Sequence, residues 1–425
     1  PNASRSPVAE EARRAWREVG TIEPLDPAEL ETQLGEADLI LDALLGTGLS
    51  RPLEGRLAEV VTHLGERRVP IVSVDVPTGA NADTAVPPGV HVHATATLQL
   101  AWPCPASALP PARFAFGVQH LADIGMPDGA LPERARPHVT RDEDVPAAWP
   151  APPPDAHKYT LGTVTVIAGS PRWSGAAELA CRGAHRAGAG LVTLVGDAPH
   201  PGRWPETMLL EVDDTPGALS RAVRQLDARH QHARVVGPGL DPERLPEIEA
   251  LLEGDGVPTV LDATALDARL RAAVVRHPGR WLTPHVGEAA RLLDRPSKEV
   301  RADPIGAAVD LAAQWQAGVV LKLAGAVLAT PSGAVRVVAA GHPAMASGGS
   351  GDVLAGVLGA ALAALAATDG LAATSHDAAL PRMAAAAHLH ARAGERAART
   401  LGQGMTASDL ADALAGTRLT LEGAW

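Results

Sequence analysis

Residues 343–352 read Pro-Ala-Met-Ala-Ser-Gly-Gly-Ser-Gly-Asp and run directly into an apolar stretch from Val353 to Ala367. Glycines let backbone N–H groups turn toward a ligand, and the beginning of a helix adds about half a positive charge there. The turn from Gly348 to Gly351 therefore predicts a phosphate-binding loop at a helix N-terminus. Asp352 is then placed to accept a proton from a hydroxyl group beside the phosphate. An aspartate that only caps a helix gives the same pattern, so the motif alone leaves both interpretations open.

Predicted strands and helices alternate around this loop, as in an α/β domain. Six strands are short apolar runs, predicted at residues 162–168, 191–195, 233–236, 258–262, 281–283 and 319–323. Two further strands, at 326–330 and 334–339, flank the turn Pro331-Ser332-Gly333 and predict a hairpin on an otherwise parallel sheet. Helices are predicted at 175–186, from Asp352 and from about Arg382. Ligands of such sheets bind beyond the carboxyl ends of the strands.

The chain before residue 146 predicts a smaller, partial α/β unit. A strand at 37–44 enters the loop Gly46-Thr47-Gly48, a helix follows at 57–64, and a second strand follows at 70–75. The first 35 residues show no strong strand pattern. Residues 146–156 are rich in proline, which is typical of a semi-rigid linker. We therefore predict domains at 1–145 and 157–425, joined by this linker.

Composition and charge restrict the class of protein. The 425 residues are 46% apolar and 20% charged, which is typical of a globular chain. The net charge of −12 argues against a general binder of nucleic acid or membrane surfaces, which would carry a basic excess. The apolar stretch at 353–367 is shorter than the roughly 20 residues that span a bilayer, so we expect a buried helix. The two cysteines, Cys104 and Cys181, exclude a disulfide framework and fit a reducing cytoplasm.

Two further strand ends carry candidate ligand-binding side chains. Only three of the 37 basic residues are lysines, and one of them, Lys322, ends an apolar strand. A lysine that leaves a buried strand beside the small residues of 323–326 can reach nucleotide phosphates, although a strand-end lysine can also simply extend into solvent. His285 and Glu288 follow the strand at 281–283, where they suit polar recognition of a sugar or a nicotinamide edge.

Taken in order, these segments resemble those of the ADP/ATP-dependent NAD(P)H-hydrate dehydratases. The matching segments are His157–Gly162, Ala168–Ser170, Ser174–Ala177, Gly188–Val192, Gly237–Gly239, Leu282–Glu288, Lys322–Ala326, Pro343–Asp352 and Gly404–Asp409. Together they span nearly all of residues 155–420, so the combined pattern is far more specific than any single glycine loop. The resemblance implies a ribokinase-like domain that removes the added water from hydrated NADH or NADPH (NADHX or NADPHX) with the help of a nucleotide cosubstrate.

The resemblance also assigns roles to individual residues of this domain. It implies that ADP or ATP, accompanied by Mg²⁺, binds at Lys322, Leu323, Ala324, Gly325, Ala326, Gly348, Gly349, Ser350 and Gly351. It implies that the hydrate contacts Ala177, Gly239, His285 and Asp352. Asp352 would be the catalytic base that activates the ring hydroxyl for phosphorylation, after which phosphate leaves.

Three positions differ from the usual pattern of that family. Leu323 stands where a glycine usually follows the lysine, His342 stands in place of an asparagine, and Thr264 replaces the second aspartate of an Asp-Ala-Asp sequence. Leu323 raises the question whether the local backbone keeps the geometry of the family. None of the three changes removes the phosphate-binding loop or Asp352.

Two segments of the first 145 residues resemble the NAD(P)H-hydrate epimerase domain, which is often fused ahead of the dehydratase. They are Asp38–Leu49 and Val74–Gly79. The resemblance implies a Rossmann-like domain that interconverts the two epimers of the hydrate, with Asp42 and Thr78 helping to hold K⁺ and with Asp75 as the acid/base. The substrate would contact Asp75 and the loop Gly46, Thr47, Gly48, Leu49, Ser50, Arg51 and Pro52.

Other features of the epimerase pattern are absent from the sequence. The Asn-Asn-Gly-Gly-Asp-Gly segment that precedes these motifs in the family is not found, and no lysine lies near Cys104. We therefore expect an epimerase-like domain that lacks its N-terminal part, and we leave its activity open.

Two other classes of function fit parts of the pattern. A ribokinase-like small-molecule kinase would use the same glycine loop and aspartate, but it would have no use for an epimerase-like partner. A non-catalytic nucleotide-binding protein would fit the change at Leu323, whereas Asp352, Lys322 and His285 argue against it. The expected partner is a small molecule rather than nucleic acid or a membrane, and the alanine-rich helices leave a homo-oligomer open.

Overall fold

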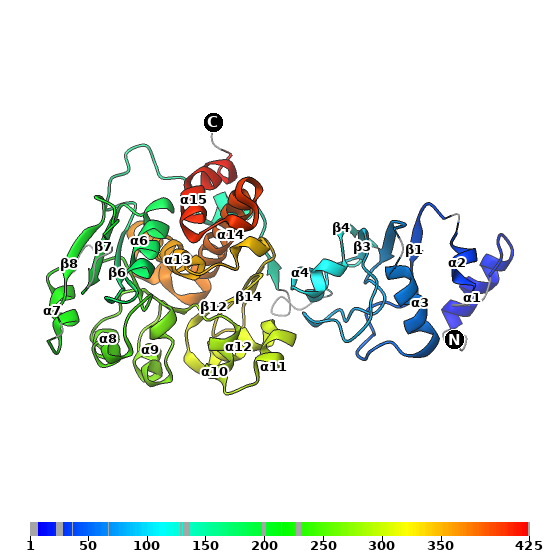
Figure 1. Cartoon of the computed structure of the whole chain (residues 1–425), viewed down its shortest axis with the longest axis horizontal. Coiled ribbons are helices and arrows are strands. Elements are labelled where there is room, and N and C mark those ends of the chain that lie inside the picture. Colours follow the sequence, from blue (N-terminus) through cyan, green and yellow to red (C-terminus); the bar gives the residue numbers. More distant parts are fainter. Residues whose placement is uncertain are drawn as a thin grey trace. The chain divides into compact units, whose positions relative to one another are not determined.

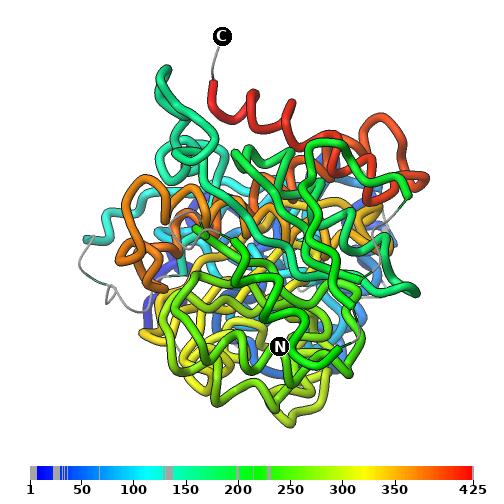
Figure 2. The backbone as a smooth tube through the Cα atoms, turned by 90° about the vertical axis from the view of Figure 1, so that its left-hand side faces the viewer, coloured from blue at the N-terminus to red at the C-terminus, as the bar shows by residue number. Residues whose placement is uncertain are grey.

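A computed structural model gives the structure of the protein, and it describes residues 7–22, 29–35, 37–66, 68–127, 130, 137–197, 201–213, 215–226 and 231–423. The chain divides into two compact units, Pro1–Ala130 and Leu131–Trp425, and each is described by itself. Figure 1 labels the elements, and Figure 2 follows the backbone as a tube.

Among the residues described for the first unit, four strands form a parallel sheet in the order β1-β2-β3-β4. The strands are β1 (Ile40–Asp42), β2 (Ile71–Val74), β3 (Ala96–Leu100) and β4 (Val118–Ala122). The helices are α1 (Pro7–Arg17), α2 (Leu30–Gln33), α3 (Gly55–Gly65) and α4 (Pro105–Ala108). The strand–helix–strand unit that the sequence predicted is therefore β1, α3 and β2.

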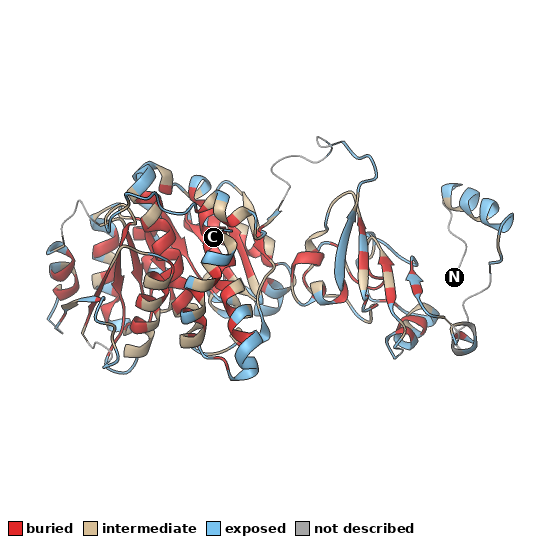
Figure 3. Cartoon of the chain, turned by 90° about the horizontal axis from the view of Figure 1, so that it is seen from above, coloured by how far each residue is buried: buried red, intermediate tan, exposed pale blue. Residues whose placement is uncertain are grey.

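One face of this sheet is packed, and the other is more open. The packed side forms a small apolar cluster with α3, whose buried members are Leu30, Ile40, Leu53, Val60, Val61, Leu64, Ile71 and Val92. The opposite face carries Leu41, Leu98 and Val118, which are 66%, 39% and 62% exposed. Figure 3 shows this alternation of buried and exposed residues along the strands. Parallel sheets are usually covered on both faces, and the described residues of this unit cover one.

The sheet of the second unit contains ten strands in the described residues, in the order β5-β14-β13-β12-β11-β10-β9-β6-β7-β8. They are β5 (His138–Val139), β6 (Thr163–Ile167), β7 (Leu191–Gly196), β8 (Met208–Glu211), β9 (Ala233–Val236), β10 (Thr259–Leu261), β11 (Arg280–Leu282), β12 (Gly318–Leu323), β13 (Gly325–Ala329) and β14 (Val335–Val338). All neighbours are parallel except β12–β13 and β13–β14, which confirms the predicted hairpin on a parallel sheet. The carboxyl ends of β9, β10, β11 and β12 therefore lie along one edge.

Helices cover both faces of this sheet (Figure 1). One layer contains α6 (Ser174–Arg186), α13 (Ser350–Asp369), α14 (His376–Leu401) and α15 (Ala407–Leu421). The other contains α8 (Leu245–Gly254), α9 (Arg271–Val275), α10 (Val286–Leu293), α11 (Ser297–Ala302) and α12 (Pro304–Trp315). Two short helices, α5 (Asp144–Ala148) and α7 (Ala218–Arg224), complete the α-helices in the described residues of this unit.

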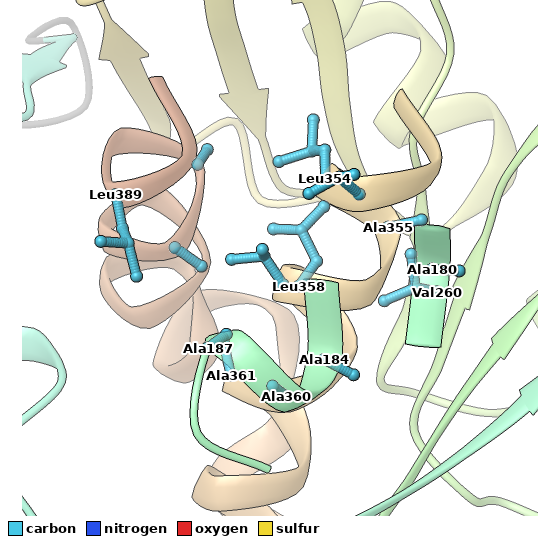
Figure 4. Packing of buried hydrophobic residues seen from close by; sticks show 14 of the residues in the cluster. Ala180, Ala184, Ala187, Val260, Leu354, Ala355, Leu358, Ala360, Ala361 and Leu389 are labelled. Atoms are coloured by element: carbon cyan, nitrogen blue, oxygen red, sulfur yellow. The ribbon is translucent and has the colours of Figure 1, made fainter. Parts of the chain in front are cut away.

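The central helix of the core is α13, which contacts α6, α14 and the strands β6, β9 and β10. Figure 4 shows Ala180 and Ala184 of α6 near Ala355 and Ala360 of α13, with Leu389 of α14 on the other side of the helix. By length and composition α13 could cross a membrane, but 72% of its most apolar window is buried inside the unit. The buried helix that the sequence predicted is thus the centre of the core.

The structure places the boundary between the units earlier than the sequence predicted. The strand β5 pairs with β14, and α5 packs against α14, so the residues just before the proline-rich segment belong to the second unit. Trp149 within that segment is 4% exposed, and the guanidinium carbon of Arg418 lies 4.4 Å from its ring centre. Residues 146–156 therefore run along the second unit, because a buried tryptophan holds them there, and they do not link the two units.

The helix predicted from about Arg382 begins earlier, at His376. Pro381 lies inside this helix. A proline cannot donate the backbone hydrogen bond of a helix interior, so the sequence pattern favoured a start just after it. In α14 the proline lies in the second turn, where the packing of the following residues against α13 maintains the helix.

Candidate active site

A cavity of about 630 Å³ lies at the carboxyl end of β12 in the second unit. Its walls come from the start of α10, the β12–β13 hairpin, residues 340–347, and parts of α13 and α14. The cavity residues that the sequence predicted are His285, Lys322, Leu323, Ala324, Gly325, Ala326, Ser350 and Gly351. Segments that are far apart in the chain therefore meet beyond the ends of the strands, as expected for an α/β sheet.

The glycine loop forms the N-terminus of α13. Gly349 is the N-cap residue, and its φ of 93° lies in the left-handed region that favours glycine. A Cβ atom at Gly351 would lie 3.3 Å from Nζ of Lys322, so the helix N-terminus and the ammonium group face the same space. Both favour a bound anion. Ser350 and Gly351 line the cavity itself, whereas Gly348 and Gly349 form the turn that precedes them.

Lys322 is held at the cavity wall by a carboxylate. Its side chain is 19% exposed, and Nζ donates a hydrogen bond of 2.7 Å to Oδ1 of Asp262, which follows β10. Burial would lower the pKa of Lys322, but the negative charges of Asp262, Glu288 and Asp352 outweigh this effect and raise the pKa. Lys322 is therefore a fixed cation, and Asp262 takes one of the three donors of its ammonium group.

Asp352 lies in the first turn of α13 and is the candidate general base. The pKa of its carboxyl group is raised to about 7, mainly by burial and also by the negative charge of Asp262, while Lys322 acts in the opposite direction. A base whose pKa lies near neutral pH accepts a proton readily and is still partly ionised in the cell. The environment of Asp352 therefore suits proton abstraction.

His285 is the N-cap residue of α10, and its ring is 60% exposed at the cavity. Nδ1 accepts hydrogen bonds from the backbone N–H groups of Gly287 and Glu288, at 2.9 and 3.3 Å. Because Nδ1 is an acceptor, the neutral ring carries its proton on Nε2. The structure therefore fits both interpretations of this residue, since one nitrogen caps the helix and the other is a donor at the cavity.

The β12–β13 hairpin accommodates Leu323 in place of the usual glycine. Leu323 pairs with Gly325 within the regular ladder, and the positive φ of 127° falls on Gly325. A Cβ atom at position 325 would lie 2.3 Å from the backbone oxygen of Val338, so only glycine fits there. The turn keeps its geometry because the requirement for glycine lies at 325 rather than at 323.

The other two departures from the family pattern also keep local hydrogen bonds. Nδ1 of His342 accepts a hydrogen bond of 3.1 Å from the backbone N–H of Ala344, as the side-chain oxygen of asparagine can do. Oγ1 of Thr264 donates a hydrogen bond of 2.6 Å to the backbone oxygen of Leu240. Neither substitution leaves its loop without a side-chain hydrogen bond.

Of the four residues predicted to contact the hydrate, His285 lines this cavity, whereas Asp352, Ala177 and Gly239 are not among its lining residues. Asp352 directly follows the lining residue Gly351, and the other two lie farther away. Ala177 is buried in α6, and Gly239 follows β9 with a φ of 65°. A Cβ atom at Gly239 would lie 2.5 Å from the backbone oxygen of Trp173, so Gly239 packs against the start of α6. Two strands, β10 and β11, separate β9 from β12, which corresponds to about 14 Å at the usual strand spacing. Ala177 and Gly239 are therefore on the β9 side of the site, and Lys322 is on the β12 side.

The sequence did not single out the cavity residues Arg301 and His390. His390 of α14 is 6% exposed, and its Nε2 donates a hydrogen bond of 3.0 Å to the backbone oxygen of Ser350. Burial lowers the pKa of His390 to about 4, so the ring is neutral at neutral pH. A histidine within an alanine-rich helix was the available signal for His390, whereas only the tertiary fold brings Arg301 of α11 to the cavity.

In the first unit, the two predicted K⁺ ligands are in direct contact. Oδ1 of Asp42, at the end of β1, accepts a hydrogen bond of 2.6 Å from Oγ1 of Thr78. Oδ2 accepts from Oγ of Ser73 at 2.8 Å and from the backbone N–H of Thr78 at 2.9 Å. Asp42 is 2% exposed, and these partners are all neutral. A buried carboxylate with neutral partners and a neighbouring hydroxyl oxygen fits a site for a monovalent cation.

Asp75 lies beside the loop of residues 46–52. Its φ of 68° is rare for a residue with a Cβ atom and is a candidate sign of a functional constraint. A Cβ atom at Gly46 would lie 3.7 Å from Oδ2 of Asp75, so the loop begins next to this carboxylate. The later loop residues Thr47, Gly48, Ser50, Arg51 and Pro52 are exposed, whereas Leu49 is half-buried and packs against the apolar cluster of this unit.

Comparison with known proteins connects both units to one family. The family model for NAD(P)H-hydrate dehydratase matches residues 164–415, and the model for the YjeF-related protein N-terminus matches residues 1–106. The bifunctional NAD(P)H-hydrate repair enzyme of Moorella thermoacetica is 37% identical over 397 residues, which are 89% of this chain and 72% of that enzyme. The Escherichia coli enzyme of the same name is 33% identical, over 84% of this chain and 69% of that enzyme. For the Thermofilum pendens enzyme the identity is 35%, and the chain spans 65% of its length.

Solved structures resemble the second unit. The ADP/ATP-dependent NAD(P)H-hydrate dehydratase from Bacillus subtilis, co-crystallised with ATP/Mg²⁺, is 27% identical with a TM-score of 0.57, over 68% of this chain and 99% of that chain. A ribokinase-like superfamily protein from Enterococcus faecalis has a TM-score of 0.56 at 22% identity, over 69% of this chain and 99% of that chain, and shows the fold alone. The predicted ribokinase-like α/β fold is confirmed. The dehydratase match covers more than half of the chain, and the chain therefore belongs to the family of bifunctional NAD(P)H-hydrate repair enzymes.

Proposed function

We propose that the second unit dehydrates the S epimer of NADHX or NADPHX to NADH or NADPH, with ADP or ATP as the cosubstrate. The observation that carries this proposal is that Lys322 and Gly351 meet at one cavity, with Asp352 in the same helical turn as Gly351. A fixed cation and a helix N-terminus suit the phosphates, and a carboxylate with a pKa of about 7 suits the removal of a proton.

The proposed reaction begins when Asp352 takes the proton of the hydroxyl group on the nicotinamide ring. The hydroxyl oxygen attacks the terminal phosphorus of the nucleotide, and the bond from that phosphorus to the bridging oxygen breaks, so that ATP yields ADP or ADP yields AMP. The ring C–O bond then breaks, and its electron pair leaves with the phosphate. The adjacent ring carbon loses a proton, which restores the double bond. Lys322 and the N-terminus of α13 would stabilise the charge on the transferred group.

The nucleotide and the hydrate would occupy opposite sides of Asp352. We assign the nucleotide to residues 322–326 and to the loop from Gly348 to Gly351, because these segments surround or adjoin the cavity. We assign the hydrate to Asp352, His285 and the pair Ala177 and Gly239 on the β9 side. An extended dinucleotide hydrate is long enough to reach from one group to the other.

Mg²⁺ is expected to arrive with the nucleotide. It keeps several water ligands and binds nucleotide phosphates rather than a complete protein cage. In the parts of the chain that the structure describes, no group of three or more His, Cys, Asp or Glu side chains is placed to hold a metal ion. The residues present therefore fit an ion held chiefly by phosphate oxygens and water, which would add positive charge at the transferred group.

For the first unit, we infer epimerisation of the hydrate with Asp75 as the acid/base. The support is the position of Gly46 beside the carboxylate of Asp75 and the rare backbone conformation of Asp75. Asp42 and Thr78 would hold K⁺, which would stabilise the ends of β1 and β2 and the loop that follows β1. Whether this unit turns over its substrate is decided by the experiment below.

A reducing cytoplasm is the compartment that we propose for the enzyme. Cys104 and Cys181 are both free, and burial raises the pKa of each thiol, to about 11 for Cys104. Such thiols stay protonated and unreactive, so the protein depends on no disulfide that a reducing compartment would break. A homo-oligomer remains a prediction.

The test supplies the chain with a mixture of the two hydrate epimers and follows the near-ultraviolet absorbance of reduced nicotinamide. ADP and ATP are added in separate reactions, and a reaction without nucleotide is the control. We expect recovery of absorbance only with a nucleotide. Recovery that continues beyond the S fraction, faster than spontaneous epimerisation, would show that the first unit is active as well, and a plateau at that fraction would show that it is not.

The same experiment separates the alternative functions. A folded chain that binds ADP or ATP but recovers no absorbance would overturn the dehydratase assignment. Consumption of ATP with a sugar or vitamin alcohol would then indicate a small-molecule kinase. Nucleotide binding without any turnover would indicate a binding protein.

A further inference from the structure

Asp262 lies behind the cavity wall and connects three neighbouring strands. It follows β10 and is 2% exposed. Oδ1 accepts a hydrogen bond of 2.7 Å from Nζ of Lys322 on β12, and another of 2.8 Å from Oγ1 of Thr283, directly after β11. The carboxylate therefore ties the carboxyl ends of β10, β11 and β12 together at the place where the cavity begins.

The negative charge of Asp262 also determines where Lys322 lies. A buried carboxylate is stable only when it is paired and hydrogen-bonded, so Asp262 requires Lys322 to stay at this position. The rotatable side chain of a lysine otherwise loses much conformational freedom when a ligand fixes it. Asp262 thus orders Lys322 before a nucleotide binds, with one of three donors used and the ammonium group beside Gly351.

The same charge acts on Asp352. The negative charge of Asp262 raises the pKa of Asp352 in addition to the effect of burial, and Lys322 opposes it. Other groups that face this cluster are Glu288, whose charge acts on Lys322, and His390, which is buried and neutral. His285 lines the same cavity. Asp262 is therefore the negative group that acts on both Lys322 and Asp352.

We propose that Asp262 is a positioning residue of the dehydratase, which holds Lys322 beside the N-terminus of α13 and orients it toward the nucleotide phosphates. This inference rests on the proposed function, because the roles of Lys322 and Asp352 are those of the dehydratase reaction. Asp262 is 2% exposed and its Oδ1 is occupied by Lys322 and Thr283, so it acts through Lys322 rather than on the substrate.

The test is the substitution Asp262→Asn, which keeps the shape and a hydrogen-bond acceptor but removes the charge. We expect the KM for ADP or ATP to rise about tenfold, since Lys322 loses a charged hydrogen-bond partner. The kcat at saturating nucleotide should change by less than the KM, because Asp352 keeps its place in α13. This difference separates a positioning role from a general loss of structure.

The matched control is Asp267→Asn, in the loop that follows the same strand. Oδ1 of Asp267 accepts a hydrogen bond of 2.9 Å from Nε of Arg269 at the surface, and we expect wild-type kinetics from this variant. A second variant, Thr283→Val, removes one hydrogen bond to Asp262 but no charge. It should raise the KM for the nucleotide several-fold, by the loss of about 1 kcal/mol of hydrogen bonding.

A wild-type KM for the nucleotide in a folded Asp262→Asn variant would overturn the proposal. If Asp262→Asn does not fold, an unchanged KM in Thr283→Val would refute the positioning role. Calorimetric titration of each full-length variant with ADP or ATP distinguishes failure of the positioning role from failure of the proposed dehydratase function. If the wild-type chain binds nucleotide but does not dehydrate the hydrate, only the dehydratase function is refuted.

Discussion

A Cβ atom added to Gly356 of α13 would lie 2.0 Å from the backbone oxygen of Ala180 in α6. The contact is reciprocal, since a Cβ atom at Gly183 of α6 would lie 2.3 Å from the backbone oxygen of Val353. The two helices therefore meet backbone to backbone at the beginning of α13, next to Asp352. The row of small residues in Figure 4 is what permits this approach, and it fixes the helix that carries the proposed base.

We predict that Gly356→Ala destabilises the protein by about 2 kcal/mol. Alanine is favoured over glycine in a helix by about 1 kcal/mol, but here its Cβ would collide with a backbone oxygen that cannot move without shifting α6. The measurement is urea-induced unfolding of both proteins. Gly175→Ala is the control, because a Cβ at this position of α6 meets no atom within 4 Å, and it should leave stability unchanged or raise it.

The pH dependence of turnover should follow the ionisation of Asp352. The base acts as a carboxylate, and its pKa is raised to about 7, so kcat/KM for the hydrate should fall below a midpoint near pH 7. An ordinary aspartate would give a midpoint near pH 4. Pre-steady-state or steady-state rates between pH 5 and 9 test this directly, and a flat profile down to pH 5 would contradict the assignment of Asp352 as the base.

Asp352→Asn should lower turnover by about a thousandfold or more, because an amide cannot accept the hydroxyl proton. The same variant should be more stable than the wild type. The unfolded chain loses the Asp352 proton near pH 4 and the folded protein near pH 7, so the stability of the wild type falls as the pH rises between these values.

The gain in stability from Asp352→Asn should therefore be small at pH 4 and reach about 1–3 kcal/mol at pH 8. Unfolding by urea at both pH values measures this difference. A variant that is less stable than the wild type at pH 8 would show that the carboxylate is favourably bound, in conflict with the raised pKa of Asp352.

Lys322→Ala should weaken binding of ADP or ATP by about a hundredfold, since a buried charge–phosphate contact contributes about 3 kcal/mol. Lys298→Ala is the matched control, because Lys298 is an exposed lysine of α11 outside the cavity wall. Calorimetric titration of the two variants compares them. Equal affinities would place the nucleotide elsewhere.

Glu395→Ala should raise the KM for the nucleotide about threefold to tenfold with little change in kcat. Oε1 of Glu395 accepts a hydrogen bond of 2.8 Å from the backbone N–H of Gly341, which lines the cavity, and Oε2 pairs with Arg392 at 2.5 Å. Loss of this anchor would loosen the cavity wall without touching Asp352. Glu253→Ala, on the exposed end of α8, should have wild-type kinetics. A fall in kcat at unchanged KM would contradict this role.

Much of the second unit was predictable because its signals are local. The strands β6, β7, β9, β10, β11 and β12 are short apolar runs that end at glycine or polar loops, and the turn at Pro331-Ser332-Gly333 fixes the β13–β14 hairpin. The strand β8, by contrast, was not predicted. The glycine loop before Asp352 requires a backbone that only glycine adopts at Gly349. By contrast, Pro381 led to a predicted start of α14 that is too late, and the prolines around Trp149 led to the prediction of a linker. Both segments are held by packing against other parts of the unit, and the local sequence does not show that packing.

The sequence by itself determined the α/β class, and it identified the glycine-rich loop, Lys322, His285 and Asp352 as candidates for the site, since each depends on residue type and spacing along one strand or helix. Only the tertiary structure decided what surrounds them. The pairing of Lys322 with Asp262, the burial that raises the pKa of Asp352 and the arrival of His390 at Ser350 all join residues that are far apart in the chain. Charge and burial act through space, and distances through space are set by the packing of the whole unit rather than by any local pattern.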